Sequence, residues 1–222
     1  MAITLEEFCR NYPTLYHMAE ANSWPSILKH GLLSTTALLD LYSITGEQRL
    51  AIESCHRPIS IIISHPSHGS AVIRDQRPMR ESALAKCLQD CSAKEWFELL
   101  NRKVFFWVTE ERVRTLLRAR AYRGREHLVI SVNTALLLQR HQRLASLSPI
   151  NSGSTIYRPV PRGIATFRPF NRYPYEHRRR TRGIAGAIAE IAFEYSVPDV
   201  GTFVRRVERR QGNRIREVIF SL

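Results

Sequence analysis

The regular segments of this chain are short, and strand and helix patterns are mixed along it. Runs of β-branched and aromatic residues predict short strands over 59–64, 104–108 and 127–132. Between them, 94–101 has the spacing of an amphipathic helix that is hardly longer. The sequence lacks the long, regular alternation of strand and helix that builds a parallel sheet. We therefore predict an α+β domain with mainly antiparallel strands.

Further elements follow the same pattern. The helix expected over 24–30 has sequence signals at both ends. Asn22 or Ser23 is the expected N-cap, Pro25 lies in the first turn, and Gly31 ends the helix. The other expected strands cover 14–17, 71–73, 203–209 and 214–222, the last two forming a hairpin joined at 211–213. The other expected helices cover 5–10, 32–44, 47–54, 82–88, 110–119 and 135–140.

One segment, at about 148–183, breaks this pattern. Five prolines and three glycines interrupt it, and tyrosines and arginines are crowded within it. Connections of this length are usually functional. We predict a single domain over 1–222 that contains this segment as a basic loop, followed by a regular apolar stretch at 184–195.

The chain is strongly basic, with a formal net charge of +13 and a pI near 10.3. Of its 33 basic residues 29 are arginine, and 151–222 alone contains 14 arginines and no lysine against six acidic residues. Arginine contacts phosphate bidentately and stacks on bases, so the excess favours a phosphate-rich partner such as a nucleic acid. A GC-rich genome would explain the choice of arginine over lysine, but not the size of the net charge.

Composition excludes several classes of protein. Hydrophobic residues make up 44% and charged residues 24% of the chain, which is ordinary for a folded domain and not for a disordered one. No apolar run is long enough for a transmembrane helix, and the N-terminus has no apolar signal core. The four cysteines show no paired framework. We therefore expect a cytoplasmic protein with no membrane partner.

Several common catalytic motifs are absent, including a phosphate loop, a dinucleotide-binding glycine fingerprint and a nucleophile elbow. Cys87 and Cys91 are four residues apart, and His65 and His68 precede them, but this spacing matches no structural zinc pattern. Buried thiols and loop imidazoles explain these residues better than a metal. We predict no metal site.

Two motifs near the ends of the chain carry the most information. The first is Leu15-Tyr16-His17 followed by the helix that ends at Gly31-Leu32-Leu33. The second is Ala189-Glu190-Ile191-Ala192-Phe193 followed by Val197-Pro198. Together they resemble the ADP-ribosyltransferase superfamily, in particular the branch of the DNA-modifying DarT toxins and the RNA 2′-phosphotransferases. The resemblance implies two small, packed, mainly antiparallel sheets that form a central cleft, with short flanking helices.

The resemblance also implies catalytic roles and NAD as co-substrate. Glu190 would bind the nicotinamide ribose and stabilise the positive charge that develops on it, and His17 would bind the adenosine ribose. Arg74 or Arg77, in the Ile73–Met79 segment, would contact the pyrophosphate and support the reaction. Taken alone, His17 could be a satisfied strand-end histidine, Glu190 an ordinary exposed carboxylate, and the two arginines part of a surface loop.

Further residues are predicted to bind NAD or the acceptor. Phe106 lies where the superfamily places the aromatic ring that stacks on nicotinamide, but the usual tyrosine is missing, so Trp107, Tyr157 or Tyr42 are alternatives. The polar loop containing Asn151, Ser152 and Ser154 would cradle a phosphate or an amide, although an ordinary turn explains it equally well. Arginines interleaved with aromatic residues are typical of single-stranded nucleic-acid binding. The expected acceptor-binding residues are Arg158, Arg162, Arg168, Arg172, Tyr173 and Arg179.

These expectations combine into one functional hypothesis. The chain is predicted to be a mono-ADP-ribosyltransferase that uses NAD to modify a nucleic acid, with DNA favoured over RNA. By family analogy it would act as a toxin or anti-phage effector with an antitoxin or immunity partner. The alternatives are modification of a protein, NAD-dependent removal of a phosphate from RNA, a nucleic-acid glycosidic-bond hydrolase, and a catalytically silent nucleic-acid-binding module.

Overall fold

A seven-stranded antiparallel sheet organises the protein. The computed structural model describes residues 1–156 and 159–222. The strands follow the order β11-β10-β6-β1-β5-β8-β7, and every neighbouring pair is antiparallel. Their bounds are β1 Thr14–Glu20, β5 Lys103–Trp107, β6 Glu126–Asn133, β7 Ala145–Ser148, β8 Glu190–Glu194, β10 Val204–Gln211 and β11 Arg214–Ser221. The prediction of an α+β domain with mainly antiparallel strands is confirmed.

The sheet consists of two ladders joined at one narrow place. Strands β1 and β6 pair over seven residues, and β5 and β8 pair over five. Between these ladders, the described residues of β1 and β5 share a single registered pair, Tyr16 with Trp107. The two separate packed sheets that we predicted are thus the two halves of one sheet. They diverge beyond the Tyr16–Trp107 pair, which we call the seam.

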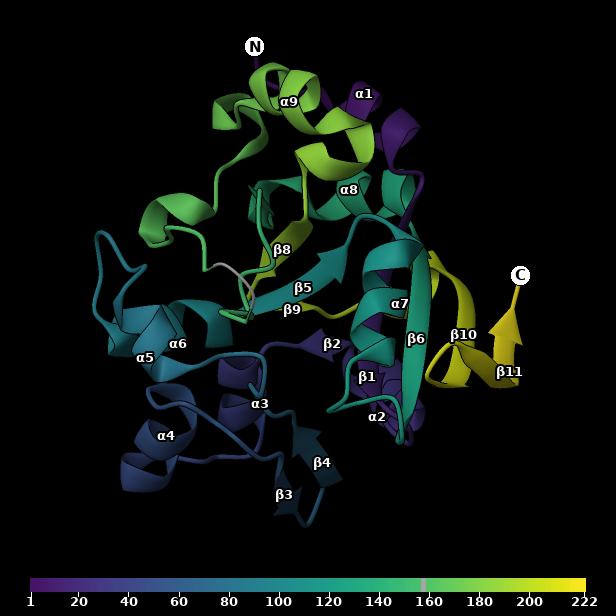
Figure 1. The fold of residues 1–222 in the computed structure, drawn as a ribbon. Coiled ribbons are helices and arrows are strands. Elements are labelled where there is room, and N and C mark those ends of the chain that lie inside the picture. Colours follow the sequence, from purple (N-terminus) through teal and green to yellow (C-terminus); the bar gives the residue numbers. More distant parts are fainter. Residues whose placement is uncertain (157–158) are drawn as a thin grey trace.

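Two small sheets and the helices lie around this frame. Strand β2 (Leu32–Leu33) pairs with β9 (Ser196–Val197), and β3 (Ile61–His65) pairs with β4 (Gly69–Ile73). Helices α1, α8 and α9 gather at one end of the molecule, whereas α3, α4, β3 and β4 form the other end (Figure 1). The helices are α1 Leu5–Asn11, α2 Trp24–His30, α3 Thr35–Leu41, α4 Gly46–Glu53, α5 Glu81–Ala85, α6 Ala93–Asn101, α7 Glu110–Arg118, α8 Thr134–His141 and α9 Tyr175–Ala187.

The two faces of the sheet are buried differently. One face carries the main core, in which Leu15, Phe106 and Ile191 are fully buried. Burying one such side chain stabilises the fold by about 1.5–3 kcal/mol. On the other face, helix α7 packs against Met18 and Val129. Because residues directly opposite each other in a ladder share a face, Trp107 and its partner Glu190 lie on the α7 face.

The two sequence motifs at the ends of the chain meet in the fold. Leu32 pairs with Val197 across β2 and β9, and Gly31 lies against Pro198. Gly31 has φ +79, and a Cβ there would come within 2.4 Å of Pro198 Cα. Only glycine fits this backbone conformation and this close approach. The predicted end of the helix at Gly31 is confirmed, and its packing partner explains the residue.

Two expected elements differ from the structure. The segment 148–183, which we expected to be a loop, contains regular structure. Short 3-10 turns cover Ile164–Thr166 and Phe170–Arg172, and α9 begins at Tyr175. Helix α9 contains a break at Gly183, where φ is +68. The helix expected over 32–44 begins instead as strand β2, because Leu32 and Leu33 pair with β9. In the described part of the chain, no helix is long and apolar enough to cross a membrane.

Candidate active site

A cleft of about 730 Å³ opens beside the seam, where β1 and β5 separate. Its walls come from the end of β1, helix α2, the end of β4 and strand β5. Small-molecule sites in proteins have volumes of about 300–1,000 Å³, so the cleft is large enough for a dinucleotide-sized ligand. Among the residues expected to bind NAD or act on it, His17 and Arg74 line this cleft.

His17 is fixed in one protonation state by its surroundings. Its Nδ1 lies 2.8 Å from the Phe105 carbonyl oxygen, which can only accept a hydrogen bond, so Nδ1 carries the proton. Burial lowers the pKa of His17 to about 4, against the raising effect of the bond to Phe105. The imidazole is therefore neutral at pH 7 and its Nε2 is a hydrogen-bond acceptor. Such a nitrogen accepts a hydrogen bond from a hydroxyl group.

Arg74 is held in the cleft by β1. Its Nη1 donates to the Met18 carbonyl at 3.1 Å, and its Nε lies 3.5 Å from Glu20 Oε1. The guanidinium also lies over the Tyr122 ring, 5.4 Å from the centroid. Burial lowers the pKa of Arg74, and Glu20 opposes this shift. A guanidinium fixed in this way is suited to contact a phosphate without large reorganisation.

Arg77 lies outside the cleft. Its side chain is exposed, and its Nε donates to the Pro58 carbonyl at 3.2 Å. Of the two arginines left open by the sequence, Arg74 is the one that reaches the cleft. The structure does not bring Arg77 into the cleft, because its guanidinium contacts Pro58 in the segment before β3.

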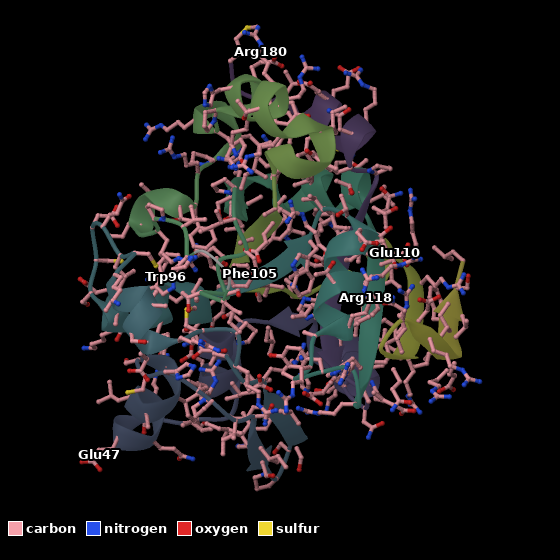
Figure 2. All side chains as sticks on the ribbon, viewed as in Figure 1. Glu47, Trp96, Phe105, Glu110, Arg118 and Arg180 are labelled. Carbon is pink, nitrogen blue, oxygen red and sulfur yellow. The ribbon has the colours of Figure 1, made fainter. Side chains whose placement is uncertain are left out.

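The aromatic residue expected to stack on nicotinamide is also corrected. Phe106 is fully buried in the main core, where its ring packs at 5.6 Å from that of Phe193. Phe105 and Trp107, on the opposite side of the strand, line the cleft instead. Phe105 lies near the middle of the molecule, as Figure 2 shows. The alternation of β5 predicts that the three aromatic residues divide between core and cleft, but not which side faces the core.

Glu190 is a buried carboxylate at the start of β8. It pairs with Trp107 on one side and with Ser148 of β7 on the other, and only 3% of its surface is exposed. Its Oε2 accepts hydrogen bonds from the Ser152 amide at 3.1 Å and the Ser152 hydroxyl at 2.7 Å. Burial raises the pKa of Glu190 to about 7, although Ser152 and the guanidiniums of Arg112 and Arg162 lower it.

The loop over 151–155 connects Glu190 to the cleft. Ser152 binds the carboxylate, and the next residue, Gly153, lines the cleft. Thr155 anchors the loop, since its amide donates to the Pro78 carbonyl at 2.9 Å and its Oγ1 accepts from the Arg80 amide at 2.6 Å. Ser154 also contacts the Pro78 carbonyl, whereas Asn151 is half-buried. Ser152 and Ser154 therefore serve the protein itself in this structure.

The expected acceptor-binding residues separate into three groups. Arg162 and Tyr173 are buried and structural: Arg162 donates to the Ser152 and Ser154 carbonyls, and the Tyr173 hydroxyl donates to the Ala187 carbonyl. Neither is therefore an exposed contact, although both line the second cavity described below. The exposed residues are Arg168, Arg172 and Arg179, of which Arg179 pairs with Glu176. Tyr157 and Arg158 lie outside the described residues.

A second cavity, of about 670 Å³, includes Arg112 and Arg162, the two guanidiniums that lower the pKa of Glu190. We call it the arginine cavity, and it is lined by Arg112, Arg162, Arg168, Arg178 and Arg182. Sequence reasoning missed Arg112, which comes from α7, and placed 178–182 in a loop although these residues belong to α9. A polar residue in the first turn of an amphipathic helix is the only signal that could have drawn attention to Arg112.

Histidine and cysteine residues form no recognisable metal centre in the described part of the chain. No group of three or more histidine, cysteine or acidic side chains there has a metal-binding arrangement. His65 and His68 stack with ring centroids 4.7 Å apart, and His30 meets His68 edge-on at 5.2 Å. Cys87 and Cys91 are both unpaired thiols.

Comparison with known proteins gives a family and a distant structural likeness. The family model described as "Family of unknown function (DUF7002)" matches residues 13–204. No curated protein matches the chain. Among solved structures, a chain of Thermosipho africanus DarTG in complex with ADP-ribose is similar, with 11% sequence identity and a TM-score of 0.44. The likeness covers 88% of the present chain but only 43% of the DarTG chain.

Proposed function

Because the chain belongs to the DUF7002 family, for which no function is described, we propose an activity from its own residues. We propose that the protein is an NAD-dependent mono-ADP-ribosyltransferase that modifies a nucleic acid. The observation that carries this proposal is the environment of Glu190, a buried carboxylate held by Ser152, whose neighbour Gly153 lines the dinucleotide-sized cleft. The two terminal motifs that resemble the ADP-ribosyltransferase superfamily support it.

The cleft offers complementary groups for the parts of NAD. The Nε2 of neutral His17 accepts a hydrogen bond from a ribose hydroxyl, and Arg74 supplies positive charge for the pyrophosphate. Phe105 and Trp107 provide aromatic surface for a ring. The cleft also holds Glu20 and Asp75, so its charge is nearly balanced and it favours a ligand that is only partly anionic.

Glu190 acts on the ribose that carries nicotinamide. As the C1′–N bond breaks, its electron pair leaves with nicotinamide, and positive charge develops on the sugar. The Glu190 carboxylate stabilises that charge and hydrogen-bonds the adjacent 2′-hydroxyl. A nucleophile of the acceptor then forms a bond to C1′ and loses its proton to Glu190. A carboxyl group with a pKa of about 7 is well matched to accept a proton near neutral pH.

The nature of the acceptor follows from charge. The chain has a net charge of +13, 14 of its 29 arginines lie in 151–222, and one of these, Arg162, lowers the pKa of Glu190. Nucleic acids bind such surfaces with release of counterions, whereas most proteins offer no comparable charge density. A nucleic acid is therefore the favoured acceptor.

The test incubates the purified protein with labelled NAD and, in separate reactions, with single-stranded DNA, duplex DNA, tRNA or a protein extract. We expect nicotinamide release with transfer of label to one nucleic-acid class. Glu190→Gln should abolish transfer, and His17→Gln should raise the KM for NAD. Glu194→Gln, on the same strand but paired with Arg102 and Lys103, is the matched control and should retain activity.

Three results would overturn the proposal. Release of a base without NAD would favour a glycosidic-bond hydrolase. Salt-sensitive binding of nucleic acid with no NAD turnover would favour a catalytically silent module. Transfer of label to protein alone would retain the transferase and replace its acceptor.

A further inference from the structure

The arginine cavity has an architecture that the cleft lacks. Its five guanidiniums come from separate parts of the chain: Arg112 from α7, Arg162 and Arg168 from the segment before α9, and Arg178 and Arg182 from α9 itself. Their convergence on one cavity is therefore a product of the fold and not of a local charge run. Figure 2 shows the contrast with Arg180, in the middle of α9, whose side chain points outward at the edge of the molecule.

Backbone carbonyls orient most of these guanidiniums. Arg112 donates from Nη2 to Ala185 at 3.3 Å, Arg168 from Nε to Ala165 at 3.0 Å, and Arg178 from Nε to Ala187 at 3.0 Å. Each of these bonds uses only part of a group that carries five N–H donors. The remaining donors are thus held in place before any ligand binds.

The positive charge of the cavity is only partly compensated by the protein, because the Glu190 carboxylate acts on Arg112 and Arg162 but not on the other three arginines. Asp90 is its one acidic lining residue among those described, and its carboxylate already accepts from the Ile164 and Ala165 amides. Within the described residues none of the five arginines forms an ion pair. Arg112 Nε is buried there without a hydrogen-bond partner. Gathering guanidiniums in this way without an anion is electrostatically costly, so the arrangement indicates an anionic ligand.

Two arginines of the cavity, Arg112 and Arg162, interact electrostatically with Glu190. Burial lowers the pKa of Arg112, and the Glu190 carboxylate opposes that shift, which places the two groups close together. Burial similarly lowers the pKa of Arg162, which Cys87 and Glu190 raise. Glu190 itself lines neither space. Its hydrogen-bond partner Ser152 precedes Gly153, which lines the cleft, whereas Arg112 and Arg162 line the arginine cavity.

We propose that the arginine cavity is a second binding site, separate from the cleft, that takes phosphate groups of an oligonucleotide. The cavity is far larger than an inorganic anion, and its five guanidiniums, four of them oriented by backbone carbonyls, suit several phosphates or one phosphate with its nucleoside. The oligonucleotide is identified as the acceptor only through the proposed transferase activity. The phosphate site itself depends on the cavity alone.

The experiment measures binding and not turnover. Anisotropy of a fluorescent single-stranded oligonucleotide is followed at several salt concentrations without NAD, using wild type, Arg168→Gln, Arg182→Gln and Arg214→Gln. Arg182 lines the cavity, is exposed, and makes no hydrogen bond within the described residues, so its replacement should not disturb the fold. Arg214 is equally exposed on β11, away from α9 (Figure 1), and is the matched control.

We expect Arg182→Gln and Arg168→Gln each to weaken binding about tenfold, the effect of one lost charge-assisted hydrogen bond. The slope of log affinity against log salt should fall by about 0.7 for each lost phosphate contact. Arg214→Gln should bind like wild type, and saturating NAD should leave oligonucleotide binding intact.

Several results would overturn the proposal. They are equal binding by wild type and both cavity variants, an equal loss in Arg214→Gln, complete displacement by NAD, and binding of inorganic pyrophosphate without binding of the oligonucleotide. Failure of NAD turnover together with the expected binding pattern would refute the transferase and leave the phosphate site standing.

Discussion

Replacing Glu190 by glutamine should stabilise the protein while abolishing the proposed activity. Burial raises the pKa of Glu190 from 4.5 to about 7, so the folded protein holds this proton more tightly than the unfolded chain does. Below pH 4.5 the group is protonated in both states and costs nothing. Between pH 4.5 and 7 the unfolded chain ionises first, and the folded state loses stability progressively.

The magnitude follows from the shift. A difference of 2.5 pKa units, that is 7 minus 4.5, corresponds to about 3 kcal/mol lost by wild type above pH 7. A glutamine has no charge to desolvate, and its side-chain oxygen can still accept both hydrogen bonds from Ser152. Glu190→Gln should therefore be more stable than wild type by about 1 kcal/mol at pH 5 and about 3 kcal/mol at pH 8.

Urea denaturation at pH 5, 6, 7 and 8, followed by tryptophan fluorescence, measures this difference. Glu194→Gln is the control, because it removes a carboxylate from the other end of β8, where Arg102 and Lys103 pair with it. A difference between Glu190→Gln and wild type that stays constant from pH 5 to pH 8 would refute the reasoning. The carboxylate would then be solvated in the folded protein.

Three further predictions concern His17, Gly31 and the biological effect. Burial lowers the pKa of His17 from 6.5 to about 4. His17 therefore contributes about 3 kcal/mol of stability that is fully present above pH 6.5 and is lost as the pH falls to 4. His17→Gln should remove this loss of stability at acidic pH in urea titrations, and an unchanged pH profile would contradict the prediction. As the pH falls in wild type, the stability lost through His17 is opposed by the stability gained when Glu190 is protonated. Each single variant should therefore show the pH dependence of stability that the other residue causes. Gly31→Ala should destabilise the protein by about 3 kcal/mol or more, because the new Cβ would clash with Pro198 and the backbone φ is positive. Gly46→Ala, with φ +60 but open space around the new Cβ, should destabilise it by only about 1 kcal/mol. Equal urea midpoints for the two variants would contradict the packing argument. If the protein is a toxin, wild type should express poorly in bacterial cells while Glu190→Gln expresses freely, and equal growth of both cultures would count against that role.

Local sequence signals predicted many of the elements and fewer of the contacts. The strand at 104–108 and the helix at 24–30 are present because β-branched runs and capping residues act over a few neighbours. The helix expected at 32–44 begins as strand β2 because pairing with β9, more than 160 residues away, overrides its local preference. No local pattern contains that pairing.

The candidate site shows the same limit. His17 and Glu190 were identified from short motifs, but the sequence could not indicate that Ser152 binds Glu190 or that Gly153 lines the cleft. Phe106 was assigned to the cleft because its strand alternates between two faces and the sequence does not label them. Arg112 was overlooked because its importance comes from α9, which brings Arg178 and Arg182 beside it.

The seam between β1 and β5 separates the two proposed catalytic residues, His17 and Glu190. His17 belongs to the ladder on one side of the Tyr16–Trp107 pair and Glu190 to the ladder on the other. Besides that pair, the bond from His17 Nδ1 to the Phe105 carbonyl joins the two strands, so a change in the distance between His17 and Glu190 would break few hydrogen bonds. The cleft could then widen to admit a dinucleotide without local unfolding of either ladder. Amide exchange within β6 and β8 should therefore stay slow when the ligand binds.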